Sequence, residues 1–367
     1  MKNGYYIHFD AKLTPGVQKK IDMQIQELKK HFVVNEINVL SEKVCLAKRL
    51  LRLLPGGAIG RTYSQALDAM DSPDFIYVRR ATADRYYVDF FRSIKKRWPA
   101  CKIMIEIFTY PYDRDEFMKM TAWPYYFKER YQRKRLVKYI DRYVTYSGDR
   151  MIFGVPTIQT GNGIVVDNVK LPTISKREND EVNLIAVAFM QRHHGYERVI
   201  KGMYQYYQKS GLRNVVCHLV GNGPEKEKYI KLVRKYGLES RVKFYPTLLG
   251  DELDTIYEKG DIALSALACY KDGVDRENSL KSREYMAKGF PMISCCKVDG
   301  LDKGYPFIYQ LSNDSQPVDI ARILQFYDEL LSRYSKNEIQ QKVRAYVKEI
   351  ADMPIVMQPI IDFINEQ

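Results

Sequence analysis

Residues 215–237 read VVCHLVGNGPEKEKYIKLVRKYG and contain the three parts of one structural unit. The apolar run 215–220 predicts a buried strand, and the stretch 226–236 predicts a helix that ends at Gly237. The Gly-Asn-Gly-Pro turn between them places Gly221 and Asn222 at the carboxyl edge of the expected sheet, where ligands of open α/β folds bind. An ordinary strand-to-helix turn is the alternative interpretation.

The same alternation of strand and helix extends in both directions along the chain. Strands that alternate with helices form parallel sheets covered on both faces, so the sequence predicts an α/β protein. A polar stretch with Pro172 and mixed charges predicts a linker between two such lobes. We expect strands at 5–9, 32–40, 75–78, 103–108, 143–146, 184–189, 215–220, 242–245, 262–267 and 292–296. The expected parts are an amino-terminal lobe at 1–165, a linker at 166–180, a carboxyl-terminal lobe at 181–350, and a helix at 351–367 that returns to the first lobe.

The composition is that of a folded protein with two domains. Of the 367 residues, 46% are hydrophobic and 28% charged, which excludes a disordered or collagen-like chain. The net charge of +13 favours an anionic partner, such as a nucleic acid, an anionic membrane or a phosphorylated ligand. The six cysteines form no C-x-x-C pair, so we expect buried thiols in a reduced cytoplasm, and neither a disulfide framework nor a zinc site.

Residues 279–293, SLKSREYMAKGFPMI, mark a second junction between a loop and a helix. Free backbone N–H groups at Ser279, Leu280 and Lys281 can face an anion there, and the helix dipole adds favourable potential. Glu284, one turn further on, offers two carboxylate oxygens to a vicinal diol such as a ribose. A solvated surface helix is the alternative interpretation.

Four motifs of the second lobe carry a family resemblance. They are HGY at 194–196, LVGNGPE at 219–225, VKFY at 242–245 with LGDEL at 249–253, and LKSREY at 280–285 with GFP at 289–291. In this order and spacing they resemble the nucleotide-sugar-binding lobe of family-4 retaining glycosyltransferases of the GT-B fold, particularly those that build bacterial surface polysaccharides. The resemblance implies two Rossmann-like doubly wound lobes that face each other across a cleft. It also implies donor contacts by Gly221, Asn222 and Tyr245, a UDP- or GDP-linked sugar, and no cofactor.

The chain departs from the family pattern at the acidic residues. Family members usually have two acids seven positions apart, and Glu284 matches the second of them. Arg276 stands where the first is expected, so Glu277, one residue further on, is our candidate for that catalytic role.

The chain also departs from the family at its cations. Phe189 and His194 stand where most members have an Arg and a Lys that neutralise the diphosphate. A leaving nucleoside diphosphate needs cations beside it, so we expect Arg192 and Lys281 to supply them and His194 to contact a phosphate.

The first lobe resembles the family less closely. Gly16 matches a glycine whose missing Cβ lets the backbone approach the diphosphate, although it is also the usual residue of a plain turn. The family's frequent catalytic histidine falls near 108–109, so this chain lacks it. Tyr110 and Asp113 are the nearest polar candidates for orienting the sugar or the acceptor, although a Tyr-Pro-Tyr loop can also simply pack.

We expect no metal site. His193 and His194 have no acidic or cysteine partners spaced to complete a tetrahedral set. Asp113 and Asp115 match a D-x-D pattern only formally, and the resemblance implies a metal-independent reaction.

Two basic segments of the first lobe indicate a membrane surface. Residues 123–143 combine seven Lys and Arg and seven aromatic residues with two acids, and residues 43–54 alternate leucine and valine with Lys and Arg. Such segments are typical of a monotopic surface for anionic lipid, although a solvated helix over a core is the alternative. No run is long enough for a membrane-spanning helix, and 1–10 lacks a secretory leader, so we expect a cytoplasmic protein that can lie at the inner face of the membrane.

The sequence therefore predicts a retaining glycosyltransferase for surface-polysaccharide synthesis. It would move a sugar from a nucleotide-sugar donor to a glycan or a lipid-diphosphate-linked acceptor. The alternative is a nonenzymatic subunit with the same fold that binds a glycan or a partner transferase. A nucleic-acid partner is disfavoured, because no RNA- or DNA-binding motif is present.

Overall fold

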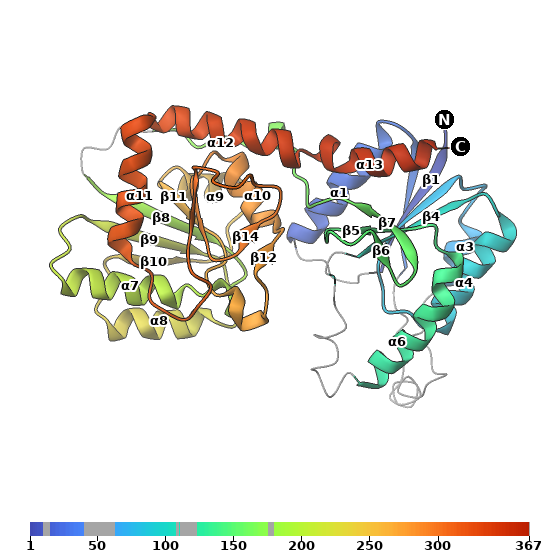
Figure 1. Cartoon of the computed structure of the whole chain (residues 1–367), viewed down its shortest axis with the longest axis horizontal. Helices are drawn as coiled ribbons and strands as arrows, with labels where there is room; N and C mark the ends of the chain where they lie inside the picture. The colour runs from blue at the N-terminus through green and yellow to red at the C-terminus, as the bar shows by residue number, and fades with distance from the viewer. Residues whose placement is uncertain (10–14, 40–62, 108–109, 111–122, 175–179, 367) are drawn as a thin grey trace. The chain divides into compact units, whose positions relative to one another are not determined.

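The computed structural model describes residues 1–9, 15–39, 63–107, 110, 123–174 and 180–366. They fall into two compact units, Met1–Gly161 with Met353–Gln367, and Asn162–Asp352. Each unit has one main parallel sheet with helices packed on it (Figure 1).

The first unit has a seven-stranded sheet in the order β2-β1-β3-β4-β5-β7-β6. All its pairs are parallel except the β6–β7 hairpin. Its strands are β1 (Asn3–His8), β2 (Val33–Asn38), β3 (Phe75–Arg79), β4 (Lys102–Ile107), β5 (Arg142–Thr145), β6 (Met151–Ile152) and β7 (Val155–Gln159). Its helices are α1 (Pro15–Lys29), α3 (Tyr63–Asp68), α4 (Arg85–Arg97), α6 (Trp123–Leu136), the short 3-10 helix η2 (Val137–Tyr139) and α13 (Met353–Asn365).

The last helix, α13, completes the first unit. It packs against α1 and brings the two chain ends close together (Figure 1). Lys102 Nζ donates to the Phe363 carbonyl at 2.8 Å, and Lys2 Nζ donates to the Ile364 carbonyl. This unit is therefore made of two separate pieces of the chain.

The second unit has a six-stranded parallel sheet in the order β10-β9-β8-β11-β13-β15, and a two-stranded sheet of β12 and β14. Its strands are β8 (Val182–Val187), β9 (Val215–Val220), β10 (Val242–Tyr245), β11 (Ile262–Leu264), β12 (Arg276–Glu277), β13 (Met292–Ser294), β14 (Lys297–Val298) and β15 (Ile308–Gln310). Its helices are η3 (Val166–Asn168), η4 (Arg192–His194), α7 (Glu197–Gln208), α8 (Lys226–Lys235), α9 (Gly250–Tyr257), η5 (Cys269–Asp272), α10 (Leu280–Ala287), α11 (Ile320–Arg333) and α12 (Lys336–Ala351).

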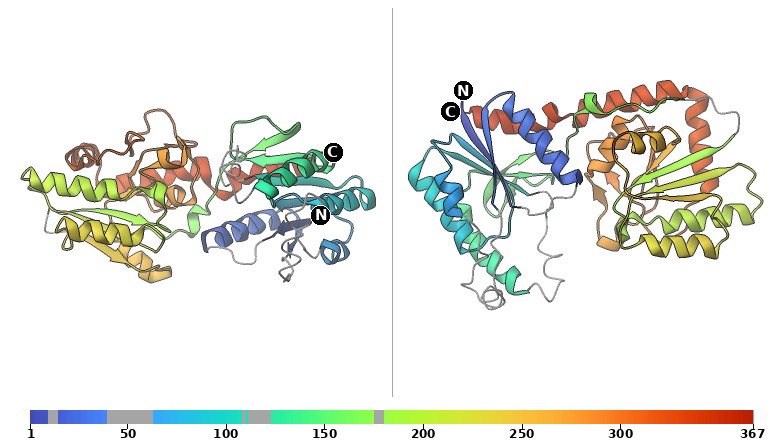
Figure 2. Two further views of the ribbon diagram at one scale, coloured as in Figure 1. Left: turned by 90° about the horizontal axis from the view of Figure 1, so that it is seen from below. Right: turned by 180° about the vertical axis from the view of Figure 1, so that it is seen from behind.

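One face of this sheet carries the core of the second unit. Alternate residues of the strands, such as Leu184, Cys217 and Leu219, are fully buried with side chains of α7, α8 and α11. The helices α7 and α8 lie side by side along the sheet in both views (Figures 1 and 2). Every second residue of the strands and the apolar face of each helix therefore pack together in one apolar layer.

The structure confirms all ten expected strands, with boundaries that shift by up to three residues. It adds the β6–β7 hairpin, the β12–β14 pair and β15, of which β6, β12, β14 and β15 have only two or three residues, too few for a hydrophobic period to be visible. Among the residues described, no helix combines the length and the apolar character that crossing a membrane requires.

Candidate functional site

The candidate donor residues of the second unit gather where its parallel strands end. The helix η4 follows β8, the 221–224 turn follows β9, and α10 precedes β13. The Tyr285 hydroxyl accepts a hydrogen bond from the Val187 N–H at 2.7 Å, which ties α10 to the end of β8. The Leu267 N–H donates to the His194 carbonyl at 3.0 Å, which ties η4 to the segment after β11.

The glycines of the 221–224 turn are required by the packing of the chain. Gly221 and Gly223 have φ angles of 124° and 139°. A Cβ on Gly221 would lie 2.1 Å from the Ala188 carbonyl oxygen, and one on Gly223 would lie 2.5 Å from Met190 N. The Asn222 side chain accepts a hydrogen bond from the Gly223 N–H at 2.9 Å. Both glycines are thus explained by close approach of two backbone segments, independently of any ligand.

The helix α10 begins directly after Ser279. Ser279 is its N-cap, and the Ser279 hydroxyl accepts a hydrogen bond from the Ser282 N–H at 3.2 Å. Leu280 and Lys281 are then the first two helical residues, whose N–H groups have no acceptor within the helix. An anion placed at this end would meet these two donors and the positive end of the helix dipole.

Lys281 adds a formal charge to the same place. Its Nζ lies 3.5 Å from the Tyr196 hydroxyl and 5.9 Å from the centre of the Tyr196 ring. Burial lowers the pKa of Lys281 to about 8, and the negative charge of Glu277 opposes this effect only in part. The ammonium group is therefore poorly compensated and would gain from an anionic ligand.

Glu277 and Arg276 point in different directions from β12. The Glu277 carboxylate accepts hydrogen bonds from the hydroxyls of Ser265 at 2.7 Å and Ser294 at 3.1 Å. Arg276 is exposed and its guanidinium pairs with the Asp299 carboxylate at 2.8 Å. Of the two residues, Glu277 is the one held beside the α10 start, and Arg276 is engaged at the surface.

The helix η4 holds a neutral histidine and an engaged arginine. His194 Nδ1 accepts a hydrogen bond from the Gln191 N–H at 2.9 Å, so the ring proton lies on Nε2. Burial lowers the pKa of His194 strongly, and the neighbouring Lys281 lowers it further. Arg192 is 66% exposed, donates to the Lys271 carbonyl at 2.9 Å and lies 3.5 Å from Asp272. His194 can therefore donate a hydrogen bond without carrying charge, and Lys281 is the better placed cation.

Glu284 is half-buried in α10. Burial raises the pKa values of Tyr257 and Tyr285, and the negative charge of Glu284 raises them further.

Tyr245 engages the site through its backbone, because its carbonyl accepts a hydrogen bond from the Gly221 N–H at 3.3 Å. Its hydroxyl lies 3.0 Å from His218 Nδ1, and its side chain lines a pocket of ≈ 580 Å³ on one face of β8, β9 and β10.

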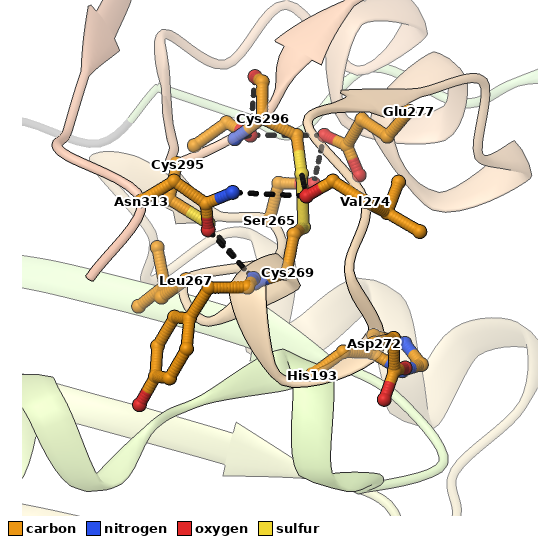
Figure 3. The surroundings of a disulfide bond; sticks show 12 residues. His193, Ser265, Leu267, Cys269, Asp272, Val274, Glu277, Cys295, Cys296 and Asn313 are labelled. Carbon is orange, nitrogen blue, oxygen red and sulfur yellow. Dashed lines mark hydrogen bonds and ion pairs between the residues drawn. A yellow bond between two sulfur atoms is a disulfide. The ribbon is translucent and has the colours of Figure 1, made fainter. Parts of the chain in front are cut away.

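The expectation of free thiols is wrong at one pair. Cys269 and Cys296 form a disulfide across a sequence separation of 27 residues, beside Glu277 and Ser265 (Figure 3). Neighbouring strands β11 and β13 bring these two segments together, a proximity that sequence spacing does not reveal. The third cysteine, Cys295, is buried next to them as a free thiol. Among the described residues, these three sulfur atoms form the one group of histidine, cysteine and carboxylate ligand atoms close enough together to hold a metal, and Cys269 and Cys296 could act as ligands only after reduction of the disulfide.

The first-unit candidates are only partly placed. Gly16 is exposed in the first turn of α1, and a Cβ added there would meet no atom of the described residues within 4 Å. Tyr110 is half-buried, and its ring packs edge-on against Phe153 with centroids 5.7 Å apart, which agrees with the packing interpretation. Asp113 and the basic segment 43–54 lie outside the described residues.

Sequence reasoning missed a buried polar cluster in the first unit. Lys20, Glu106 and Tyr146 hydrogen-bond to one another from α1, β4 and the residue after β5. The available signal was an acid near the end of the otherwise apolar run 103–107. Their partnership was invisible, because Lys20 and Glu106 are 86 residues apart.

The basic–aromatic segment 123–143 is helical over its first part, α6. Trp123, Phe127 and Tyr131 follow at intervals of four residues, so they share one face, and they are 40%, 56% and 63% exposed. Part of the basic charge is neutralised internally, since the buried Arg133 lies 3.3 Å from Glu129. The helix therefore presents aromatic side chains outward and keeps some of its charges inside.

Comparisons with known proteins concern residues 169–297 and the fold. The family model described as "Glycosyl transferases group 1" matches residues 169–297, which include η4, the 221–224 turn and α10. No curated protein matches the chain. Among solved structures, HepE from Anabaena in complex with UDP and glucose is 13% identical, with a TM-score of 0.63 and 99% of each chain covered. The lipopolysaccharide outer core galactosyltransferase WaaB is 14% identical, with a TM-score of 0.58 and 99% of each chain covered.

A third solved structure has a similar fold over almost the whole chain. It is a trehalose-6-phosphate synthase studied for glycosyltransfer with retention, 12% identical, with a TM-score of 0.59 and 98% of each chain covered. At these identities the likeness establishes the fold, and the family match covers the second unit's site. Residues 169–297 therefore carry the sequence pattern of glycosyl transferases group 1, on a chain that has the GT-B fold of two parallel-sheet lobes.

Proposed function

We propose that the chain is a retaining, metal-independent glycosyltransferase. It transfers a sugar, such as a hexose, from a UDP- or GDP-linked donor to a glycan or a lipid-diphosphate-linked acceptor in surface-polysaccharide synthesis. The observation that carries the proposal is the start of α10, where two N–H groups without an acceptor in the helix, the under-compensated Lys281 and the carboxylate of Glu277 lie together. The solved structure of HepE, which holds UDP and glucose, supports the choice of donor.

In the proposed reaction the chain supplies position and charge. The bond between the sugar and the diphosphate breaks as an acceptor hydroxyl bonds to the same face of the sugar, and the hydroxyl proton passes to a donor phosphate oxygen. Lys281 and the N–H groups of Leu280 and Lys281 stabilise the leaving diphosphate, and His194 Nε2 donates a hydrogen bond. Glu284 binds the ribose hydroxyls.

Nucleotide binding tests this donor site. UDP, GDP and ADP are compared by thermal shift, since a ligand that binds only the folded protein raises its melting temperature. We expect one of them to stabilise the wild type and Glu284→Ala to weaken that binding by about tenfold to a hundredfold, the usual range for a charged hydrogen bond. Glu329→Ala, on α11, is the control variant. Unchanged affinity in Glu284→Ala with an intact fold would remove Glu284 from the site.

The second candidate function is a nonenzymatic subunit that binds a glycan or a partner transferase. It is favoured by Phe189, which is 63% exposed where a cation is expected, and by the engagement of Arg276 with Asp299. The two functions separate in the thermal shift, because the nonenzymatic subunit would show little response to any nucleoside diphosphate.

We also propose that α6 lets the protein lie at the inner, cytoplasmic face of an anionic membrane. Aromatic rings at the interface and nearby cations are the recognised means of such attachment. Co-sedimentation with anionic vesicles should fall with rising salt, and fall by about tenfold in a Phe127→Ala, Tyr131→Ala double variant, since each ring buries apolar area. Salt-independent sedimentation would contradict the electrostatic part of this proposal.

A further inference from the structure

A buried ionic cluster lies near the carboxyl edge of the first unit's sheet. Lys20 Nζ on α1 donates to Glu106 Oε1 at 2.7 Å, and also to the Tyr146 hydroxyl. The Tyr146 hydroxyl donates to the same Oε1, and the Gln24 amide reaches it at 3.4 Å. Three donors from two segments of the chain therefore converge on one carboxylate oxygen of β4.

Burying these charged groups costs desolvation free energy, which a purely structural role would not need. Glu106 is 0% and Lys20 4% exposed. Burial on its own would raise the pKa of Glu106, but the charges of Lys20 and Arg79 outweigh burial and lower it. Burial lowers the pKa of Lys20, and Glu106 offsets this in part. Buried ion pairs often stabilise a fold no better than apolar residues of the same volume. Stability alone therefore does not explain why an ion pair occupies this buried position.

The carboxylate of Glu106 is also incompletely satisfied. Among the described residues, no hydrogen-bond donor reaches its second oxygen, Oε2, although this atom is buried. Buried polar atoms without partners are rare in folded proteins and concentrate where function requires them.

The cluster lies beside the segments that the proposed function uses in this unit. Glu106 pairs in register with Val144, near the carboxyl ends of β4 and β5, where ligands of open α/β sheets bind. Lys20 follows Gly16 by four residues, so the two lie one turn apart on the same side of α1. A Cβ on Gly16 would meet none of the described residues within 4 Å, so packing against them does not explain the glycine.

We propose that Glu106 is a positioning residue for sugar transfer. It holds Lys20, and through Lys20 the first turn of α1 with Gly16, and it holds Tyr146 at the end of β5. The inference rests on the proposed glycosyltransferase function and adds to it a residue that acts through others. The competing interpretation is that the ion pair only stabilises the fold.

A second ion pair in the same unit, more exposed than Lys20–Glu106, provides a control. Lys95 Nζ lies 2.7 Å from Asp141 Oδ2, and the same Oδ2 accepts the Ile103 N–H at 2.7 Å. This pair lies at the amino ends of β4 and β5, the edge opposite to Glu106. Asp141→Asn therefore removes a paired carboxylate at the opposite edge of the same sheet, away from the proposed site.

The experiment compares three variants of the full chain, Glu106→Gln, the double variant Lys20→Met with Glu106→Gln, and Asp141→Asn. Melting temperature, nucleoside diphosphate affinity, and kcat and KM for transfer are measured for each. Hydrogen exchange of a peptide that covers 15–29 reports directly on the start of α1.

We expect Glu106→Gln to lower kcat by at least about a hundredfold with diphosphate affinity within about threefold of wild type, and to speed exchange at the start of α1. Asp141→Asn should lower the melting temperature without a comparable loss of kcat. In the double variant both charges of the Lys20–Glu106 pair are removed together, so part of the stability lost in Glu106→Gln should recover while kcat stays low.

Recovery of kcat together with stability in the double variant would overturn the proposal, and so would equal kcat losses in Glu106→Gln and Asp141→Asn. A wild type that binds no nucleoside diphosphate and transfers no sugar would instead refute the proposed function. The two failures are therefore distinguishable, and the exchange measurement on Glu106→Gln remains informative in either case.

Discussion

The reduced basicity of Lys281 predicts that nucleotide binding depends on pH in the alkaline range. Burial lowers the pKa of this side chain to about 8 in the protein without ligand. A bound diphosphate would favour the ammonium form and return the pKa towards its ordinary value of about 10.4. The protonated form therefore binds UDP or GDP more tightly, and affinity should fall once the pH exceeds about 8.

The size of the effect follows from the two pKa values. Between about pH 7 and about pH 9.5 the dissociation constant should rise by about 30-fold, which corresponds to about 2 kcal/mol of binding free energy. Without nucleotide the sign is opposite. The unfolded chain binds more protons than the folded one between about pH 8 and about pH 10.4, so the free energy of unfolding gains from Lys281 as the pH rises through this range.

Isothermal titration of UDP or GDP at several pH values measures this dependence in the wild type and in Lys281→Arg. The guanidinium of Lys281→Arg stays charged throughout this pH range. The nucleotide affinity of the variant should therefore lack the pH dependence that the lysine causes in the wild type. Protonation of the nucleotide itself changes its affinity for the wild type and for Lys281→Arg equally. The ratio of the two affinities at each pH therefore depends only on the charge of residue 281. Parallel curves for the two proteins would refute the assignment of Lys281 to the diphosphate.

Three further predictions concern other positions of the second unit. Gly221→Ala should lower the free energy of unfolding by about 3 kcal/mol, because the residue has a positive φ and a carbonyl oxygen lies where its Cβ would be. Gly237→Ala should lower it by only about 1 kcal/mol, because Gly237 has a positive φ but no described atom within 4 Å of an added Cβ. Denaturant titration compares the two variants, and equal losses would contradict the packing argument. Reduction of the Cys269–Cys296 disulfide should lower the free energy of unfolding by about 3 kcal/mol, and melting curves with and without dithiothreitol that coincide would show that the bond is absent. Arg276→Ala should leave nucleotide affinity within about twofold of wild type, as expected for an exposed ion pair, and a larger change would place Arg276 in the site.

Sequence reasoning succeeded where the signal is local and periodic. The run 215–220 is a strand because six buried residues follow one another, and its turn and helix follow directly. Ser279 could be recognised as lying at a loop-to-helix junction, but its role as the N-cap could not be, because a cap depends on one side-chain hydrogen bond and not on a period. The different surroundings of Arg276 and Glu277 became visible only in the structure, because adjacent strand residues face opposite sides.

Contacts between distant segments could not be derived in this way. The Lys20–Glu106 pair and the Cys269–Cys296 bond each join residues that neither periodicity nor spacing relates. Both arise because parallel pairing places strands that are far apart in the chain beside each other. A single sequence shows which residues can take part in such contacts but not which partners they meet.

The two-piece construction of the first unit has a consequence for how the protein is made. A ribosome releases β1 to β7 long before it releases α13, yet α1 relies on that last helix for an apolar neighbour. The first unit must therefore wait, with part of its surface uncovered, until synthesis of the second unit is finished. Nascent chains stalled before residue 353 should consequently be more open to chaperones and proteases at α1 than the released protein is.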